Sequence, residues 1–360
     1  MITEIRLENF KSFRELTKIP LKKVTVFIGP NGSGKSTPLQ ALMLLKQSAF
    51  AEGVTTRGIY VDLGDNLGLF SIEGHGLNYK IGVTFQDESR LNGEVDIDVL
   101  VKPNAHIDAT SFIPEKQTML KSVMDNIYYV SEWRGFYQSS TDISAVDTNR
   151  LFRNPAVADT SSLVASALSR DPKLRRKISD WLKGITDVRI DHALARGGFL
   201  PAEGPYVPRQ NVLSQLSEEE AINIVNEGFG SNQLVQLLVQ LARCPKGSFL
   251  AIEEPEAHLH PKAQVALVKV LLERAKEYDL QLVLVTHSEH VLHTILNQVA
   301  KGNLTPKDAG LLYFRKEDGV SIIEERVITK RGQVKGGLPD FFEVELEQFS
   351  EFVEALSKHK

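Results

Sequence analysis

The 360-residue chain contains a single cysteine, Cys244, and only two tryptophans. One thiol can form neither an internal disulfide nor a cysteine-rich zinc site, and it fits a reducing compartment. The N-terminus has no apolar stretch like that of a signal peptide, and no uncharged apolar run approaches the about 18 residues that span a membrane. These absences lead us to expect a cytoplasmic protein without a membrane segment.

An excess of positive charge is also lacking, because 42 lysines and arginines face 46 aspartates and glutamates, for a net charge of −4. A nucleic-acid site would therefore have to be a local patch. Hydrophobic residues make up 42% and charged residues 24% of the chain, which excludes wholesale disorder. At about 100–200 residues per domain, the length allows two to three domains.

The clearest motif that is present is a phosphate-binding loop. Residues 29–36 read G-x-x-x-x-G-K-S, after an apolar β-branched run at 24–28 and before a leucine-rich helical pattern. Glycines let backbone N–H groups surround a phosphate, the lysine reaches the β- and γ-phosphates, and the serine hydroxyl binds Mg²⁺. ATP and Mg²⁺ are thus the predicted ligands, with Ser36 as a metal ligand. Pro38 follows at the edge of the first helical turn, where proline is still tolerated. The predicted nucleotide-binding residues of the loop are Asn31, Gly32, Ser33, Gly34, Lys35, Ser36 and Thr37.

An apolar strand that ends in two carboxylates is the second motif. Residues 248–252 run into Glu253 and Glu254, and ligands of open α/β sheets bind at this end of the strands. Glu253 is predicted to hold Mg²⁺ through water, and Glu254 to orient and deprotonate the attacking water. The alternative, a solvated acidic turn, is disfavoured because the strand is too apolar for a surface edge.

A histidine just past another apolar run, 281–285, forms the third motif. From this place His287 is predicted to reach the γ-phosphate or the attacking water, and so to be catalytic. A zinc site is the alternative, because this part of the chain holds five of the nine histidines. It is disfavoured because the helical H-E-x-x-H spacing is absent. The five are His258, His260, His287, His290 and His293.

A glycine-rich segment at 228–230 is the fourth motif. Ser231 is expected to cap a helix whose leucines recur at helical spacing. Another helix is expected to begin at Ser217, where the following glutamates give the spacing of a capping box. Further on, helical patterns alternate with apolar strands, which predicts a parallel sheet.

Taken in order, these motifs resemble the SMC/RecF/OLD-like branch of ABC-type ATPases. The resemblance implies an α/β fold, a P-loop NTPase of ABC/SMC-head type with a mixed β-sheet core, an antiparallel β subdomain and a helical insert. It also implies that Ser231 and Asn232 bind the γ-phosphate of ATP held by another subunit, so that a homodimer or higher oligomer forms through the ATP sites. The segments that carry the resemblance are 5–13, 29–37, 227–233, 253–261 and 286–288.

The chain departs from the family pattern at several points. Its signature loop reads Gly-Ser-Asn-Gln instead of the Leu-Ser-Gly-Gly-Gln of transporter ATPases, which argues against transport. Glu253 replaces the usual aspartate, and Gln86 is the candidate for the Q-loop glutamine. Arg134 resembles a recurrent arginine of OLD-like proteins. The alternative for Arg134 is a surface arginine on the insert.

Four segments are expected on this basis. Residues 1–103 would form the N-terminal half of the ATPase head, with alternating patterns that predict antiparallel strands at 79–85 and 95–101. Residues 104–212 would form a mostly helical insert, 213–330 the C-terminal half of the head, and 331–360 a tail with an acidic helix. Too few residues follow Ser288 for the Toprim nuclease that many OLD proteins carry. Family members of this size are often encoded beside an effector, in anti-phage defence or DNA-processing systems.

The predicted function is a Mg²⁺-dependent ATPase that dimerises around ATP and acts as a switch in a nucleic-acid-related process. Its partner would be an effector, a nuclease or a toxin, encoded nearby. The alternative is a nucleotide-gated interaction module with negligible hydrolysis. DNA or RNA could contact a local basic patch, although the same residues also suit a solvated helix face. The patch consists of Lys173, Arg175, Arg176 and Lys177.

Overall fold

The helices and strands of the chain form three sheets with helices around them. The computed structural model describes residues 1–49, 56–58, 61–64, 69, 78–87, 93–101, 114–132, 134, 141–142, 160–194, 209–215, 221–226 and 228–338. The elements are, in chain order, β1 (Ile2–Glu8), β2 (Thr17–Pro20), β3 (Val24–Ile28), α1 (Thr37–Ala49), β4 (Tyr79–Asp87), β5 (Gly93–Val101), α2 (Pro114–Asp125), β6 (Ile127–Val130), β7 (Thr141–Asp142), α4 (Thr160–Arg170), α5 (Pro172–Thr186), β8 (Arg189–Leu194), β9 (Arg209–Gln215), β10 (Ala221–Asn223), the 3-10 helix η3 (Ile224–Asn226), α6 (Phe229–Arg243), β11 (Phe249–Glu253), α7 (Pro261–Glu277), β12 (Gln281–Val285), α8 (Glu289–Ala300), β13 (Ala309–Glu317) and β14 (Val320–Glu325).

A six-stranded sheet forms the centre of the molecule, in the order β14-β13-β3-β12-β11-β6. Its inner strands β3, β12 and β11 are parallel, and every residue in them is buried. Strands that are covered on both faces read as continuous apolar runs, which explains why 24–28, 249–252 and 281–285 do not alternate. At one edge, β14 runs antiparallel to β13 and makes the sheet mixed. The predicted mixed α/β core is confirmed.

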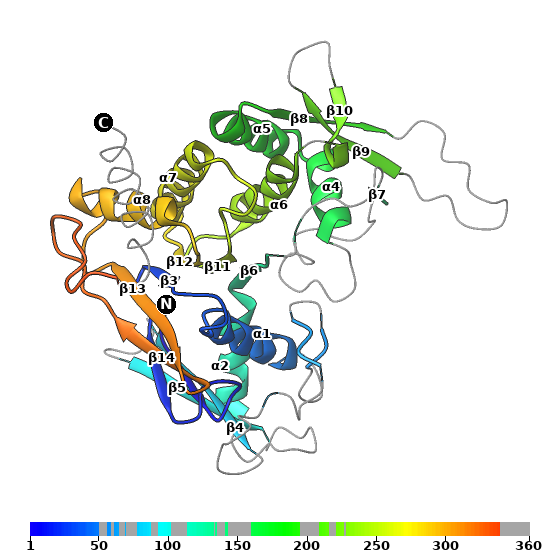
Figure 1. The fold of residues 1–360 in the computed structure, drawn as a ribbon. Coiled ribbons are helices and arrows are strands. Elements are labelled where there is room, and N and C mark those ends of the chain that lie inside the picture. The colour runs from blue at the N-terminus through cyan, green and yellow to red at the C-terminus, as the bar shows by residue number, and fades with distance from the viewer. Residues whose placement is uncertain are drawn as a thin grey trace, which may run out of the picture.

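Two hydrophobic layers cover the opposite faces of this sheet (Figure 1). Alternate residues of one strand serve the two layers, because Val24 and Val26 of β3 pack into one and Phe27 into the other. Helices α5, α6, α7 and α8 build the first layer. Helices α1 and α2 build the second, together with the antiparallel sheet β2-β1-β4-β5. Strands β4 and β5 confirm the antiparallel pair predicted at 79–85 and 95–101.

The segment predicted as a mostly helical insert, 104–212, contributes a strand to the core. Strand β6 pairs in parallel with β11, and α2 packs against α1. The segment also supplies β7, β8 and the first half of β9, and these strands form a separate small sheet with β10. Sequence patterns missed the place of β6 because parallel pairing joins residues that are far apart along the chain. The segment boundaries themselves stay a prediction.

The chain before α6 forms a strand where a helix was expected. Residues 221–223 are β10, antiparallel to β9, so the helix predicted from Ser217 onward is wrong for this part. Helix signals give way here because β9 offers a hydrogen-bonded partner. Gly228, not Ser231, is the N-cap of α6, and Ser231 is the third residue of that helix. Residues 216–220 and the acidic helix predicted in the 331–360 tail lie outside the described residues.

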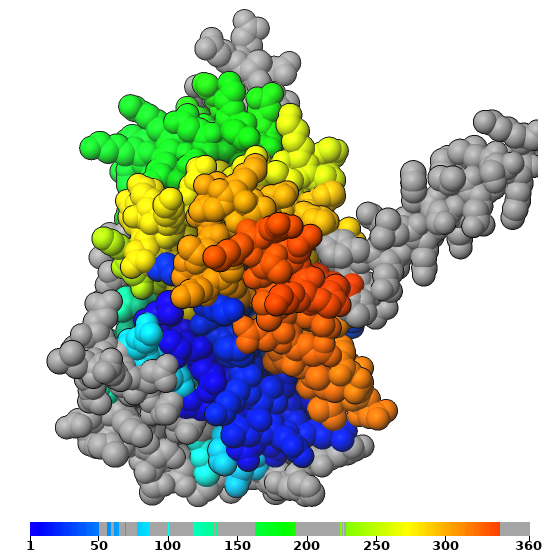
Figure 2. All heavy atoms as spheres, turned by 90° about the vertical axis from the view of Figure 1, so that its left-hand side faces the viewer, coloured from blue at the N-terminus to red at the C-terminus, as the bar shows by residue number. Residues whose placement is uncertain are grey.

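The strand pair β13–β14 supports the phosphate-binding loop from one side. In Figure 2 these strands (orange) lie beside the N-terminal segment (blue). The Ser321 hydroxyl of β14 donates to the Ser33 carbonyl over 2.7 Å and shares a hydrogen bond of 2.6 Å with the Ser12 hydroxyl. Gly29 approaches β13 so closely that a Cβ there would lie 2.0 Å from the Phe314 carbonyl oxygen. Only glycine fits at this start of the loop.

Gly29→Ala is expected to lower the free energy of unfolding by about 2–4 kcal/mol. The new methyl group would collide with the Phe314 carbonyl, and φ at this residue is +146°. Gly247→Ala is the matched control, because its φ is +80° and no atom lies within 4 Å of the added Cβ. The control should cost about 1 kcal/mol. Urea denaturation measures both, and equal losses would contradict a role for the close approach to β13.

Candidate active site

The phosphate-binding loop connects β3 to α1. Gly32 and Gly34 have positive φ of 74° and 94°, and α1 begins at Thr37, so the start of the helix faces the inside of the loop. Asn31 and Gly32 are exposed at its tip, whereas Ser33, Lys35 and Thr37 are buried. Pro38 is the second residue of α1, within the first turn where proline is tolerated.

Lys35 is held by the loop itself. Its Nζ donates to the Pro30 carbonyl over 2.7 Å, and the residue is 5% exposed. Burial lowers the pKa of Lys35 to about 8, an effect that the nearby carboxylates of Glu254 and Glu256 partly offset. The ammonium thus lies among acidic groups, bound to a neutral acceptor that a phosphate oxygen could replace.

Glu253, the last residue of β11, is almost fully buried. The hydroxyl groups of Tyr129 and Ser36 lie near its carboxyl group, while Oε1 is buried with no hydrogen-bond partner. Burial raises the pKa of Glu253 to about 7, and the two hydroxyl groups oppose that effect. Mg²⁺ prefers carboxylate, hydroxyl and water oxygens, so the unpartnered Glu253 oxygen and the nearby Ser36 hydroxyl fit this ion.

Glu254 and His287 follow the ends of neighbouring strands. The two side chains approach each other, with Glu254 Oε1 3.8 Å from His287 Nε2. The φ of Glu254 is 43°, a left-handed conformation, and its N–H donates to the Val285 carbonyl of β12 over 2.8 Å. Burial, followed by the positive charge of Lys35, lowers the pKa of His287. A carboxylate and a neutral imidazole therefore lie together beside the Lys35 ammonium.

Glu256 ties the two strand ends together, although the sequence did not single it out as a site residue. Its Oε1 accepts from the Thr286 hydroxyl over 2.6 Å and from the N–H groups of His287 (2.9 Å) and Ser288 (3.2 Å). Burial nonetheless raises the pKa of this carboxyl. Tyr129 was also missed, because its strand reads as ordinary core. The Glu-Pro-Glu spacing was a usable signal for Glu256.

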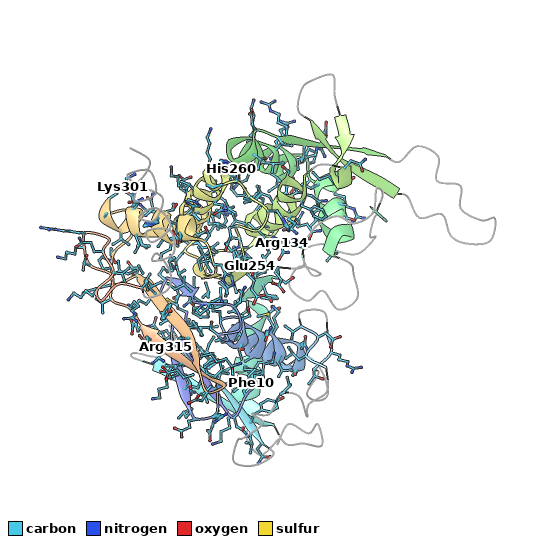
Figure 3. All side chains as sticks on the ribbon, viewed as in Figure 1. Phe10, Arg134, Glu254, His260, Lys301 and Arg315 are labelled. Carbon is cyan, nitrogen blue, oxygen red and sulfur yellow. The ribbon has the colours of Figure 1, made fainter. Side chains whose placement is uncertain are left out.

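Arg134 lies at the centre of the site, near Glu254 (Figure 3). It is 4% exposed, so the alternative of a surface arginine is wrong. Its guanidinium donates to the main-chain carbonyls of Glu253 and Glu254. Burial lowers the pKa of Arg134 to about 10, and four nearby glutamates oppose that effect, so the side chain stays charged at neutral pH.

Ser231 and Asn232 lie in the first turn of α6, in a different part of the molecule. Ser231 lines an open groove of about 590 Å³ formed by the end of α5, the start of α6 and residues 258–263. Asn232 is 4% exposed. The Phe229 ring, 62% exposed, packs 5.5 Å from the His258 ring at the same place. The structure thus gathers the predicted loop, acidic pair and His287 at one site, and places the signature residues at another.

Comparison with known proteins identifies the family. Residues 24–293 match the family described as "AAA domain, putative AbiEii toxin, Type IV TA system". The chain belongs to this AAA family. Over 99 residues it is also 27% identical to the uncharacterized protein MJECL11 of Methanocaldococcus jannaschii, covering 28% of this chain and 81% of that protein.

The fold of this AAA-family protein is that of SMC head domains. An SMC head bound to the C-winged helix domain of ScpA superposes with a TM-score of 0.58 at 16% identity, over 91% of this chain and 98% of the other. The head with an extended coiled coil from Pyrococcus furiosus gives 0.58 and 15%, over 99% of both chains. The head from Pyrococcus yayanosii gives 0.57 and 12%, over 90% and 96%. The predicted SMC-like P-loop ATPase is confirmed as to fold and family.

Other predicted residues of the AAA-family protein lie apart from the site. Gln86 is exposed in β4, where its N–H donates to the Met1 carbonyl. Among the described residues, no three histidine, cysteine or acidic side chains are grouped to hold a metal. His260 instead caps α7, its side chain accepting from the Lys262 N–H. No helix in the described part of the chain is long and apolar enough to cross a membrane.

The four residues of the predicted basic patch differ in their surroundings. Arg175 lies 3.2 Å from the Asp191 carboxylate, and Lys177 lies 4.8 Å from the centroid of the Trp181 ring. Lys173 and Arg176 are exposed on α5. Two of the four cations are therefore accessible for another partner.

Glu253→Gln is expected to stabilise the nucleotide-free protein at alkaline pH and not in acid. The folded state raises the pKa of Glu253 to about 7, so this group favours folding below its unfolded pKa of about 4.3, and that contribution is lost as the pH rises through 7. A neutral amide avoids the loss, which should amount to about 3–4 kcal/mol at pH 8. Denaturation at pH 4 and pH 8 measures it, with the exposed Glu273→Gln as a control for removing one negative charge. A gain that does not depend on pH would contradict this prediction.

Proposed function

We propose that this AAA-family protein is a Mg²⁺-dependent ATPase that converts ATP to ADP and phosphate. One observation carries the proposal. Glu253 has a buried Oε1 without a hydrogen-bond partner, its carboxyl group interacts with the Ser36 hydroxyl, and the next residue, Glu254, lies against His287. Glu253 and Ser36 suit a metal ion, and Glu254 and His287 suit proton transfer.

Nucleotide binding rests on the loop 29–36 and the start of α1. The N-terminus of a helix and the N–H groups of a glycine-rich turn present positive potential to a phosphate. Lys35 would exchange its bond with the Pro30 carbonyl for a charge-assisted bond with a β- or γ-phosphate oxygen. Because Lys35 is almost fully buried, little water screens this interaction.

Ser36 and Glu253 would hold Mg²⁺, Glu253 through water. The bound ion neutralises charge on the phosphate oxygens. Binding the ion also favours the ionised form of Glu253, which burial alone disfavours. Asn31, Gly32, Ser33, Gly34 and Thr37 would complete the nucleotide cradle.

Glu254 would act as the general base toward the attacking water. Its side chain is 37% exposed, so water can reach it, while its backbone is bonded to β12. His287 is neutral at pH 7 because its pKa is lowered, and it can hydrogen-bond the water or the γ-phosphate. A module that only binds nucleotide needs neither group, so this arrangement favours hydrolysis over the nucleotide-gated interaction module.

Dimerisation around ATP is proposed from the position of Ser231 and Asn232. The groove at Ser231 is lined by the starts of α6 and α7 and by Lys183 and Lys262, which favour an anion and outnumber the one carboxylate there, Asp187. Asn232, the next residue of α6, is buried behind it. The P-loop residues do not line it, so the groove suits a γ-phosphate held by a second copy of the chain. Two such contacts would give a homodimer with two composite ATP sites.

A switch role in a defence or DNA-processing system is the wider proposal. The family description names a toxin and a toxin–antitoxin system, and two of the similar SMC heads are bound to a domain of ScpA. We therefore propose an effector, a nuclease or toxin, encoded nearby, that responds to ATP-driven dimerisation in the cytoplasm. DNA or RNA would use the exposed Lys173 and Arg176.

Lys35→Ala is expected to weaken ATP binding by at least about 100-fold, because it removes the buried positive charge that meets the β- and γ-phosphates. Isothermal titration with ATP and Mg²⁺ measures the affinity. Lys22→Ala is the control. Lys22 lies at the opposite end of β3 from the P-loop, so this variant should leave the affinity for ATP unchanged. Binding of wild-type strength by the Lys35 variant would rule out the assigned loop.

Glu254→Gln is expected to bind ATP, to lose nearly all turnover and to accumulate as an ATP-bound dimer, because the amide keeps the shape but cannot take a proton. Ser231→Arg should bind ATP and remain monomeric, because its bulk fills the place of the partner's phosphate. Light scattering with ATP and Mg²⁺ distinguishes the two.

Ser231→Ala is the matched control for bulk at that position and should still dimerise. Normal turnover by Glu254→Gln would contradict the proposed base. ATP-driven dimerisation of Ser231→Arg would contradict the composite site and would favour the nucleotide-gated module.

A further inference from the structure

The edge strand β6 leads into a buried arginine that contacts the backbone of both acidic residues. We propose that Arg134 is the positioning residue that holds Glu254 in its left-handed conformation, and thereby aims the carboxylate at the water it deprotonates. The proposal rests on the proposed hydrolysis. It adds a second contact that orients Glu254. This contact comes from the end of β6, which flanks β11 on the side opposite to β12 and His287.

The contacts of Arg134 bridge two chain segments. Its Nη1 donates to the Glu253 carbonyl over 2.8 Å and to the Ser131 carbonyl over 3.0 Å, and its Nη2 donates to the Glu254 carbonyl over 2.6 Å. The planar guanidinium can meet two successive carbonyls at once, in a fixed orientation. The side chain thus links the end of β6 to the turn that follows β11.

The backbone at Glu254 needs such support. A non-glycine residue with φ of 43° is in an unfavourable region, which persists only where surrounding contacts enforce it. On one side, the Glu254 N–H is bonded to Val285 of β12. On the other side, its carbonyl is bonded to Arg134. Glu254 is therefore fixed from both neighbouring strands, and its carboxylate comes within 3.8 Å of His287.

Lysine cannot replace this arginine. An ammonium carries its three donors on one nitrogen at the end of a flexible stem, so it lacks the two separate, coplanar nitrogens with which the guanidinium holds both carbonyls in a fixed orientation. The proposal therefore expects Arg134→Lys to keep a positive charge in the site and still lose alignment. This variant therefore separates two explanations: a loss of turnover in Arg134→Lys indicates lost orientation of Glu254, because the positive charge is still present.

Turnover and binding should respond differently. Arg134→Lys and Arg134→Met are expected to reduce kcat by about 10- to 100-fold, because a small misplacement of a catalytic group has effects of that size. Their affinity for ATP and Mg²⁺ should stay within about threefold of wild type, because the P-loop contacts are intact. In the Glu254→Gln background, Arg134→Lys should cause no further loss, because the group that it positions has already been disabled.

Arg274→Lys is the matched control. Arg274 is also buried, at 3% exposed, and donates to a main-chain carbonyl, that of Ala242 over 2.9 Å; its acidic partner is Glu277, which is not part of the site. The control should lower the melting temperature without changing kcat. An Arg134 variant that loses kcat and ATP affinity together, in proportion to its melting temperature, would show a merely structural role and overturn the proposal.

A readout without turnover keeps the proposal separate from the proposed hydrolysis. Hydrogen exchange of the Glu254 amide, measured against that of Ala251 within β11, should become faster in both Arg134 variants and stay unchanged in Arg274→Lys. If wild-type protein hydrolyses no ATP, the proposed function fails. The exchange experiment still tests whether Arg134 holds the backbone of Glu254. Unchanged exchange at Glu254, unchanged kcat, or additive losses with Glu254→Gln would each overturn the assignment of Arg134.

Discussion

The parallel register of β3, β12 and β11 is the constraint on which the site depends. Phe27 lies opposite Val285, and Val285 lies opposite Glu253, so three strands end in one row. The P-loop, the turn with His287 and the turn with Glu254 all start from that row. The register is set by burial on both faces, because slipping a strand by one residue would exchange the side chains that pack into the two layers. Packing of the core therefore fixes the relative positions of the P-loop, Glu254 and His287.

The site concentrates negative charge at the end of β11. Glu253, Glu254 and Glu256 lie within four residues, and burial raises the pKa of the first and the third. The fold offsets this with hydroxyl groups, main-chain N–H groups and one buried guanidinium, instead of with direct ion pairs to each carboxylate. Lys35 adds a positive charge nearby. A site of this kind gains from Mg²⁺, because a divalent cation meets an acidic cluster that the protein has only partly neutralised.

Two faces of the molecule divide the work in the proposed mechanism. One holds the loop, the acidic pair and His287, and the other presents Ser231 in a groove between α5, α6 and α7. The separation follows from topology, because α6 packs on one face of the sheet while the P-loop leads into α1 on the other. In this proposal a single chain would carry both halves of an ATP site without joining them. This is what makes a dimer the natural unit of the proposed switch.

Local chemistry made part of this protein readable from its sequence. The P-loop, the inner strands and the acidic pair were found because their signals lie within a few neighbouring residues, where glycine conformation, apolar runs and adjacent carboxylates are visible directly. The place of β6 was not, because it depends on pairing with β11, far along the chain. The local helix signals also misplaced two neighbouring features, since residues 221–223 pair with β9 as a strand and α6 begins after Gly228 instead of at Ser231. Arg134 shows the difference most clearly. Its sequence allowed either a surface arginine or a functional one, and only the tertiary structure, by packing β6 against β11, placed its guanidinium on the carbonyls of Glu253 and Glu254.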